Sequence, residues 1–211
     1  MTRTPTKPDA AAALPDDAEF LTFEQFLQSP RFHERVEWVD GKLSPMHSVL
    51  EPHDRLSGFL SALLEPYVRH AKLGRLLHEP YLMRLPDQQA ARSPDMFFVK
   101  AARVDLVTRE CLRGPADLAI EIASPDSRQR DRVHKFAEYE LAGIPEYWIL
   151  DPDERRADFF RLGADGRYAR VDTDAGVYTT DQLPAMRLNV EWLWQSDPPD
   201  PIAVLRDWGV I

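Results

Sequence analysis

Two acidic side chains stand at predicted strands, where a charge is costly to bury. Asp95 precedes an apolar run at residues 96–99, and Glu121 lies between two isoleucines. A buried carboxylate needs a cation, a hydrogen-bond donor or a proton. Mg²⁺ and Mn²⁺ bind oxygen ligands, commonly one or two protein carboxylates with waters and substrate phosphate, so the pair suits a shared metal. The alternative is structural, with Asp95 capping a turn and Glu121 paired with an arginine such as Arg92.

A lysine on the helix predicted after Glu121 is the third candidate. Lys135 stands four residues after Asp131 and four before Tyr139, which is the spacing of one helix face. Beside a metal and a phosphate, an ammonium group orients the attacking water or stabilises developing negative charge. The alternative is an ion pair with Asp131, worth a few tenths of a kcal/mol. Under both interpretations, replacing Lys135 is expected to change stability by under about 0.5 kcal/mol.

These candidates belong to a predicted strand–helix–strand unit at residues 117–151. Residues 117–123 alternate, with leucine and isoleucines on one face and Glu121 among small residues on the other, which predicts a strand. Ser124-Pro125-Asp126 ends that strand and supplies N-cap chemistry for a helix from Ser127 to Ala142. Its expected core positions are Val133, Phe136, Ala137 and Leu141. The apolar run Glu146–Asp151 predicts a buried strand, paired in parallel with the first.

Periodicity and turn residues predict the other elements. Thr22 caps a short helix through about Ser29, and Asp40-Gly41 forms the turn of a hairpin at 35–46. We further expect a long helix from Pro52 to about Lys72, strands at 75–85 and 94–100 separated by a loop at 86–89, an irregular stretch at 101–116, a hairpin of 157–162 with 168–171, and a last segment at 183–194 on the surface of the core.

Length and composition favour one globular domain. Of 211 residues, 44% are hydrophobic and 10% aromatic, so we expect residues 19–211 to form a single α/β domain and residues 1–18 a disordered leader. The formal charge of −9 argues against a chain-wide electrostatic grip on nucleic acid or on an anionic membrane. Cys111, the single cysteine, excludes an internal disulfide and makes zinc binding and nucleophilic catalysis poor interpretations. With no signal peptide or membrane span in the sequence, a cytoplasmic location is expected.

Four motifs follow one another in a recognisable order. They are Pro94-Asp95; Glu121 with Ser124-Pro125; Asp131, Lys135 and Tyr139; and Gly143-Ile144-Pro145-Glu146-Tyr147-Trp148 ending in Asp151-Pro152. This succession resembles the Uma-two endonuclease family of the restriction endonuclease-like, PD-(D/E)xK, superfamily. The resemblance covers roughly residues 20–195 and is most specific between Glu121 and Asp151. The superfamily pattern has a lysine two residues after the acid, where this chain has Ala123.

The resemblance implies a site and a reaction. It implies that Asp95 and Glu121 are ligands of Mg²⁺ or Mn²⁺ and that Lys135 takes the place of the missing lysine. The implied reaction is phosphodiester hydrolysis, with DNA favoured over RNA as the substrate. A groove between the two subunits of a dimer is one way in which the DNA would be held. Glu37, in Val36-Glu37-Trp38-Val39-Asp40-Gly41, would be a further acid of the site, and His53 would contact substrate. The alternatives are an exposed Glu37 paired with Arg35 or Lys42, and a His53 that only caps its helix or lies on the surface.

The predicted architecture is a central mixed sheet flanked by helices, with Asp95 and Glu121 on adjacent strands. A protein of a different class remains open, namely a non-catalytic interaction or scaffold protein that retains a nuclease fold, because fold alone does not establish activity.

Overall fold

The structure is a computed structural model that describes residues 20–46, 50–125 and 127–211. The predicted leader at 1–18 and Asp126 of the predicted N-cap lie outside these residues. Three sheets are present, with strand orders β2-β1-β5-β4-β7, β11-β10-β9-β8-β6-β3 and β12-β13. The expectation of a single domain over 19–211 stays a prediction.

The six-stranded sheet is mixed, as predicted. Its strands are β3 (Gly74–His78), β6 (Met96–Lys100), β8 (Leu118–Ile122), β9 (Glu146–Asp151), β10 (Arg156–Leu162) and β11 (Tyr168–Val171). Strands β8 and β9 pair in parallel, and the other neighbours pair antiparallel. Asp95 directly precedes β6 and Glu121 lies in β8, so the prediction of adjacent strands is confirmed.

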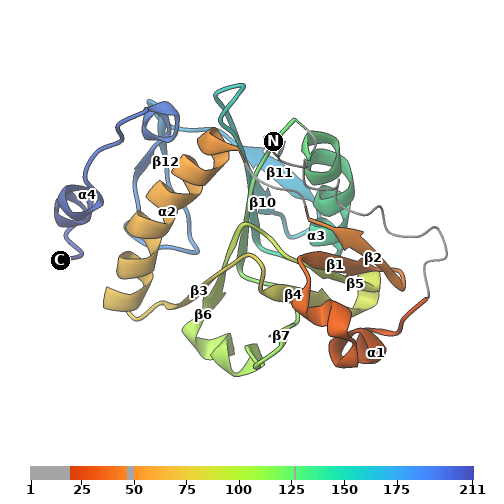
Figure 1. Cartoon of the computed structure of the whole chain (residues 1–211). Helices are drawn as coiled ribbons and strands as arrows, with labels where there is room; N and C mark the ends of the chain where they lie inside the picture. The colour runs from red at the N-terminus through yellow and green to blue at the C-terminus, as the bar shows by residue number, and fades with distance from the viewer. Residues whose placement is uncertain (1–19, 47–49, 126) are drawn as a thin grey trace, which may run out of the picture.

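Helices cover both faces of this sheet (Figure 1). Helix α2 (Glu51–His70) packs its predicted apolar stripe, including Leu60 and Leu63, against the Leu118, Ile120 and Ile122 face of β8. The opposite face carries Ala119, Glu121 and Ala123, and packs beneath the helix that follows β8. The alternation predicted for 117–123 therefore separates an apolar core face from a face with one carboxylate.

The helix after β8 differs from its prediction. It contains a π-helical segment, η4 (Arg130–Lys135), that continues into α3 (Phe136–Leu141). Among the expected core positions, Val133 and Leu141 are 54% and 71% exposed, Ala137 is exposed, and Phe136 is partly buried. The buried side chains are instead Asp131, Lys135 and Tyr139. The predicted apolar face is therefore wrong, because polar partners below the helix hold its polar side inward.

The five-stranded sheet carries the N-terminal part of the chain. It contains β1 (Val36–Val39), β2 (Lys42–Pro45), β4 (Leu82–Leu85), β5 (Ala90–Arg92) and β7 (Cys111–Arg113). Asp40 and Gly41 have φ angles of 48° and 81°, which confirms the two-residue hairpin turn. Helix α1 (Phe23–Gln28) begins with the predicted Thr22 cap and packs on this sheet. The 3₁₀ segments η1 (Pro30–His33) and η2 (Pro86–Gln88) complete its connections.

Two predictions between residues 75 and 116 are wrong. The single strand expected at 75–85 is two strands, β3 and β4, which lie in different sheets on either side of Pro80. Proline has no N–H for a sheet ladder, so the break falls there. The stretch expected to be irregular contains the 3₁₀ segment η3 (Ala101–Leu106) and strand β7, and β5 was also not predicted. Strands of three residues are too short to give a clear alternating signal.

The C-terminal part packs against α2. The hairpin of β10 and β11 is confirmed. Beyond it lie β12 (Val177–Tyr178), β13 (Leu188–Asn189), the 3₁₀ segment η5 (Val190–Trp194) and α4 (Pro201–Asp207). Leu183, Leu188 and Leu193 are buried in the core cluster that contains α2, while Pro184 and Glu191 are exposed, so the segment 183–194 lies on the surface of the core as expected. No helix in the described ranges combines the length and the apolar character needed to cross a membrane.

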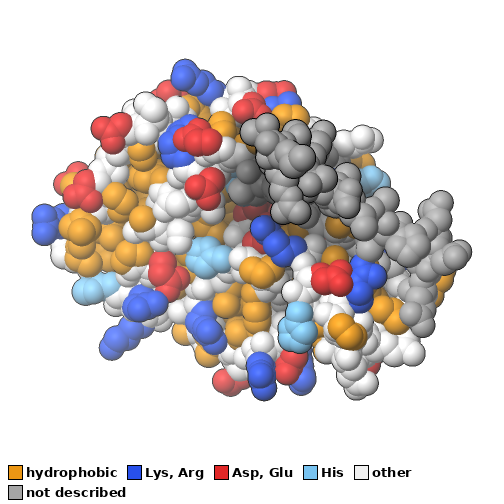
Figure 2. Space-filling model, in the orientation of Figure 1, with side chains coloured by type: hydrophobic (Ala, Val, Ile, Leu, Met, Phe, Trp, Pro, Cys, Tyr) orange, Lys and Arg blue, Asp and Glu red, His pale blue; other side chains and the backbone are white. Residues whose placement is uncertain are grey.

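The face of the molecule in Figure 2 carries acidic and basic side chains interspersed, with hydrophobic side chains between them. This face therefore presents no field of a single sign, although the chain as a whole has a formal charge of −9.

Candidate active site

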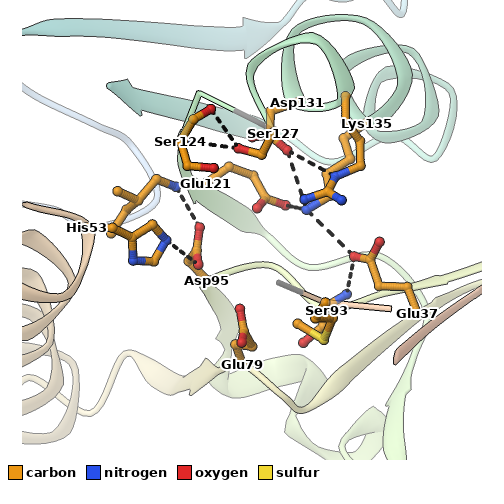
Figure 3. Close-up of a pocket in the computed structure, with 13 residues that line it drawn as sticks. Glu37, His53, Glu79, Ser93, Asp95, Glu121, Ser124, Ser127, Asp131 and Lys135 are labelled. Carbon is orange, nitrogen blue, oxygen red and sulfur yellow. Dashed lines mark hydrogen bonds and ion pairs between the residues drawn. The ribbon is translucent and has the colours of Figure 1, made fainter. Parts of the chain in front are cut away.

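A cavity of about 60 Å³ lies where the two larger sheets meet the helix after β8. All five residues singled out in the sequence line it (Figure 3): Glu37, His53, Asp95, Glu121 and Lys135. They come from β1, the first turn of α2, the residue before β6, β8 and η4. Residues 37 and 135 are far apart in the sequence, so only the tertiary fold brings this set together.

Asp95 is fixed at the edge of the cavity by two contacts. Its Oδ2 accepts a hydrogen bond of 2.6 Å from the Ile122 backbone N–H, and its Oδ1 lies 3.0 Å from His53 Nε2. The pairing of Met96 with Ile120 makes Asp95 and Glu121 the next opposed positions of the two antiparallel strands. Opposed side chains have Cβ atoms roughly 4.5–5.5 Å apart, so the two carboxylates face the same small space.

Glu121 is almost wholly buried and is held through one oxygen. Its Oε1 accepts hydrogen bonds from Lys135 Nζ at 2.7 Å and from the Tyr139 hydroxyl at 2.9 Å. The alternative pairing with Arg92 is therefore wrong. Burial raises the pKa of Glu121 to about 8; Lys135 opposes this rise, while the nearby charges of Asp131 and Asp95 add to it. A cation in the cavity would favour the ionised carboxylate.

Lys135 is a buried cation among three carboxylates. Its Nζ lies 2.7 Å from Glu121 Oε1, 3.6 Å from Glu37 Oε1 and 3.6 Å from Asp131 Oδ1. Burial alone would lower the lysine pKa, but these carboxylates raise it, so the ammonium group keeps its proton. The expected ion pair with Asp131 is present, yet it is not the shortest contact. The expected stability change of under about 0.5 kcal/mol for replacing Lys135 assumed an exposed ion pair, whereas Lys135 is buried, so a larger change is now expected.

The lysine that the superfamily pattern has two residues after the acid is absent, because Ala123 stands at that position. The Ala123 side chain is fully buried on the same face of β8 as Glu121, in the cluster that contains Tyr139. No amine is present there, and Lys135 reaches Glu121 from the adjoining helix instead. The amine next to Glu121 therefore comes from the helix that follows β8 and not from the strand itself.

Glu37 lies inside the site, so the alternative of an exposed hairpin glutamate is wrong. It is 3% exposed and accepts hydrogen bonds from Arg92 Nη1 at 2.9 Å and from the Ser93 backbone N–H at 3.1 Å. Burial tends to raise its pKa, but Lys135 and Arg92 together bring the pKa below its usual value. Arg92 also binds both oxygens of Glu138, at 2.7 and 2.6 Å. Glu37 is therefore an ionised carboxylate that helps hold Lys135.

His53 is buried at the start of α2, not exposed as its alternative supposed. Its Nε2 contacts Asp95, and its Nδ1 has no hydrogen-bond partner among the described residues. His53 thus supports a carboxylate of the cavity, and its contact with substrate stays a prediction.

Sequence reasoning assigned no role in the site to several other lining residues. They are Met46, Glu79, Ser93, Ile122, Ser124, Ser127, Arg130 and Asp131. Asp131 had a signal, because its spacing from Lys135 and Tyr139 places all three on one helix face. Glu79 and Ser93 gave none, since they reach the cavity only through the pairing of β3 and β5 with their neighbours.

The residues of the cavity fit a hydrated divalent cation. Within the part of the chain that is described, no group of three or more His, Cys, Asp or Glu side chains is arranged to hold a metal by itself. Mg²⁺, however, is commonly bound by one or two carboxylates and completes its shell with water. Five acidic side chains, one lysine, one arginine and one histidine line the cavity, so acidic groups are in excess. A volume of about 60 Å³ also exceeds the roughly 10–15 Å³ that one water needs.

Comparisons with known proteins agree with the resemblance inferred from the motifs. The family model Uma2, described as "Putative restriction endonuclease", matches residues 23–191. A crystal structure described as "a putative nuclease belonging to DUF820 from Anabaena variabilis" is similar, with a TM-score of 0.67 and 20% sequence identity over 82% of this chain and 97% of that chain. No curated protein matches the chain. The mixed sheet flanked by helices is thus a fold shared with that structure, as predicted.

Proposed function

The chain belongs to the Uma2 family, and on that premise we propose that it is a divalent-metal-dependent endonuclease that hydrolyses phosphodiester bonds, with DNA preferred over RNA. The observation that carries the proposal is the hydrogen bond of 2.7 Å from Lys135 Nζ to Glu121, in the cavity that Asp95 also lines. Two acidic side chains that can bind a metal ion, together with one fixed cation, are the groups that phosphoryl transfer uses to stabilise negative charge. The single cysteine, Cys111, is free and buried, which suits a reducing compartment such as the cytoplasm.

Asp95 and Glu121 would hold Mg²⁺ or Mn²⁺. When bound, such an ion stabilises negative charge on the phosphate and lowers the pKa of water. Asp95 is already oriented by the Ile122 N–H and by His53, so one carboxylate is in place before any ligand arrives. The second, Glu121, uses one oxygen for Lys135 and Tyr139, and neither hydrogen bond occupies its other oxygen.

Lys135 supplies a fixed positive charge at the scissile phosphate. The carboxylates of Glu121, Glu37 and Asp131 surround its ammonium group and keep it protonated. Because the side chain is buried, it loses little freedom when substrate binds and points at the cavity throughout. Its role is to orient the attacking water or to stabilise charge on the phosphate. Glu37, which is bonded to Arg92 in the five-stranded sheet, helps to hold Lys135 in that orientation.

An acidic chain must bind nucleic acid locally. Arg130 lines the cavity and is one-third exposed, so it is a candidate contact for a backbone phosphate. With a charge of −9, affinity should depend strongly on the metal and fall with added salt. A homodimer that joins two such sites is one way to complete a groove for a duplex.

Plasmid cleavage tests the proposal. Supercoiled plasmid and single-stranded DNA are incubated with Mg²⁺ or Mn²⁺, and in chelator, using wild type, Asp95→Asn and Glu121→Gln. We expect metal-dependent cleavage by wild type but not by Asp95→Asn or Glu121→Gln, and a lower Mn²⁺ affinity by calorimetry in both of these variants. Glu154→Gln, an exposed acid outside the cavity, is the matched control and should behave as wild type. Wild type that neither cleaves nor binds Mn²⁺ more tightly than Glu121→Gln would favour the scaffold alternative.

A further inference from the structure

Asp131 is a further carboxylate of the cavity, and its only role so far is as one of the three carboxylates around Lys135. It lies in the first turn of η4 and is 1% exposed. Its backbone is fixed at two points, since its N–H donates to the Ser127 carbonyl at 2.9 Å and its carbonyl accepts from the Tyr147 hydroxyl at 3.0 Å. Figure 3 shows Asp131 and Lys135 coming from the same helix toward Glu121. The position of Asp131 is therefore determined by the core as well as by the helix.

The side chain of Asp131 is not satisfied by the protein around it. Its Oδ1 is buried and has no hydrogen-bond partner among the described residues. The nearest cationic atoms, Lys135 Nζ and Arg130 Nε, are 3.6 and 3.9 Å away, beyond hydrogen-bond distance. The short bond of Lys135 goes to Glu121 instead. A buried carboxylate oxygen without a partner is unfavourable, and such atoms are usually satisfied by water or an ion.

The cavity offers room for a water but not the geometry for direct metal binding. Asp131 lines it together with Asp95 and Glu121. No three such side chains in the described ranges are placed to bind one metal together. The volume of about 60 Å³ accepts more than one water. A water between Asp131 and the acid pair would satisfy the free oxygen and complete the shell of an ion held by Asp95 and Glu121.

We propose that Asp131 binds and orients, through Oδ1, a water that lies between it and the divalent-cation site formed by Asp95 and Glu121. This inference rests on the proposed function and adds a residue to it. Asp131 holds a water of the metal shell rather than the metal itself. Both Asp131 and Lys135 lie in the π-helical segment η4, in keeping with the frequent occurrence of π turns at functional sites.

A purely structural role predicts the opposite behaviour of one variant. If Asp131 served mainly as the ion-pair partner of Lys135, Asp131→Asn would lower the melting temperature of the metal-free protein and leave metal affinity unchanged. If Oδ1 binds a water of the metal shell, the carboxylate is unsatisfied in the metal-free protein. Asp131→Asn then removes an unfavourable buried charge, so the metal-free variant should melt at or above the melting temperature of wild type. Metal affinity then falls, as it does when outer-shell partners are removed, by roughly 10–100-fold.

The test measures Mn²⁺ affinity by calorimetry, melting with and without Mn²⁺, and plasmid cleavage for wild type, Asp131→Asn and Asp131→Ala. Asp153→Asn removes an exposed aspartate near the same helix and serves as the matched control. We expect Asp131→Asn to bind Mn²⁺ at least about 10-fold more weakly, to gain less thermal stability from Mn²⁺, and to melt no lower than wild type without metal. Asp131→Ala should bind Mn²⁺ as weakly.

Two results would overturn the inference while leaving the proposed function intact. One is an Asp131→Asn protein whose Mn²⁺ affinity and cleavage rate are within about twofold of wild type, a change too small for a lost shell contact. The other is a metal-free Asp131→Asn protein that melts well below wild type, which would make the charge a structural requirement. Wild type that binds no Mn²⁺ and cleaves nothing would overturn both proposals together.

Discussion

Replacing Lys135 by methionine removes the one charge that Glu121, Glu37 and Asp131 share, while keeping an unbranched side chain of similar length. Removing one partner of a buried ion pair costs about 3–5 kcal/mol, because the other charge is left uncompensated. Glu121 limits this loss. Burial raises its pKa to about 8 in the wild-type protein, so at pH 7 it is already largely protonated and leaves little uncompensated charge when Lys135 is removed. We therefore expect a loss of about 2–3 kcal/mol at pH 7.

The loss should grow with pH. A carboxyl group whose pKa is raised in the folded state favours folding at low pH, and that contribution disappears as the pH rises through the folded value. For Glu121 that value is about 8 with Lys135 present, and it is higher without it. The difference in stability between Lys135→Met and wild type should therefore be larger at pH 9 than at pH 6.

Thermal melting and plasmid cleavage measure the two consequences. For a domain of this size, 1 kcal/mol corresponds to about 2–4 °C, so the variant should melt roughly 4–12 °C below wild type at pH 7. Its metal-dependent cleavage should fall by about 10²-fold or more, the scale of losing one preorganised electrostatic group. Lys100→Met, at an exposed position at the end of β6, is the matched control and should change stability by under about 0.5 kcal/mol.

Either half of this reasoning can fail by itself. A Lys135→Met protein that melts with wild type at pH 7 and pH 9 would show that the ammonium group does not stabilise the buried carboxylates. A variant that is destabilised yet cleaves at the wild-type rate, once conditions keep both proteins folded, would end the catalytic assignment of Lys135 and leave Asp95 and Glu121 to be tested separately.

Three further substitutions test other parts of the structure. Burial raises the pKa of Glu146, so its contribution to stability falls as the pH rises above the ordinary pKa of 4.5. Denaturant titrations at several pH values measure how the free energy of unfolding depends on pH, and Glu146→Gln should make this dependence weaker. An unchanged pH dependence would argue against a titrating Glu146. Leu141 is 71% exposed, so Leu141→Ala should change the free energy of unfolding by under about 0.5 kcal/mol. Tyr139→Phe, which removes the hydroxyl that donates to Glu121, should cost about 1 kcal/mol. If chemical denaturation gives the reverse order for Leu141 and Tyr139, the helix faces the other way.

Local patterns were enough for the elements that carry long, regular signals. Helix α2 was recognised from its apolar stripe, α1 from Thr22, and the strands β8 and β9 from alternation and apolar content. The division of residues 75–85 between two sheets was not recognisable, because it depends on which distant strands pair with each half. The three-residue strands β5 and β7 are strands because they pair with β4, and the periodicity of the sequence does not reveal that pairing.

The candidate site was predictable where a charge interrupts an apolar strand. Asp95 and Glu121 gave that signal, Lys135 followed from its place on the helix after Glu121, and the family resemblance added Glu37 and His53. The bonds that fix them were not predictable. Arg92 was considered as a partner for Glu121, yet it binds Glu37 and Glu138, because β5 places it on the other side of the cavity.

The clearest failure of sequence reasoning, the face of the helix after β8, lies at the site itself. Burying Lys135 while exposing Val133 and Leu141 is unfavourable by the hydrophobic effect alone, since apolar surface gains about 25 cal/mol per Å² on burial. The arrangement holds because Glu121 lies below the helix and accepts from both Lys135 and Tyr139. A rule that ranks helix faces by apolar content therefore selects the wrong one when the sheet beneath carries a carboxylate. In this chain the conflict between the apolar pattern and the Asp131, Lys135, Tyr139 spacing falls at the site for which we propose chemistry, as expected if local consistency gives way to function there.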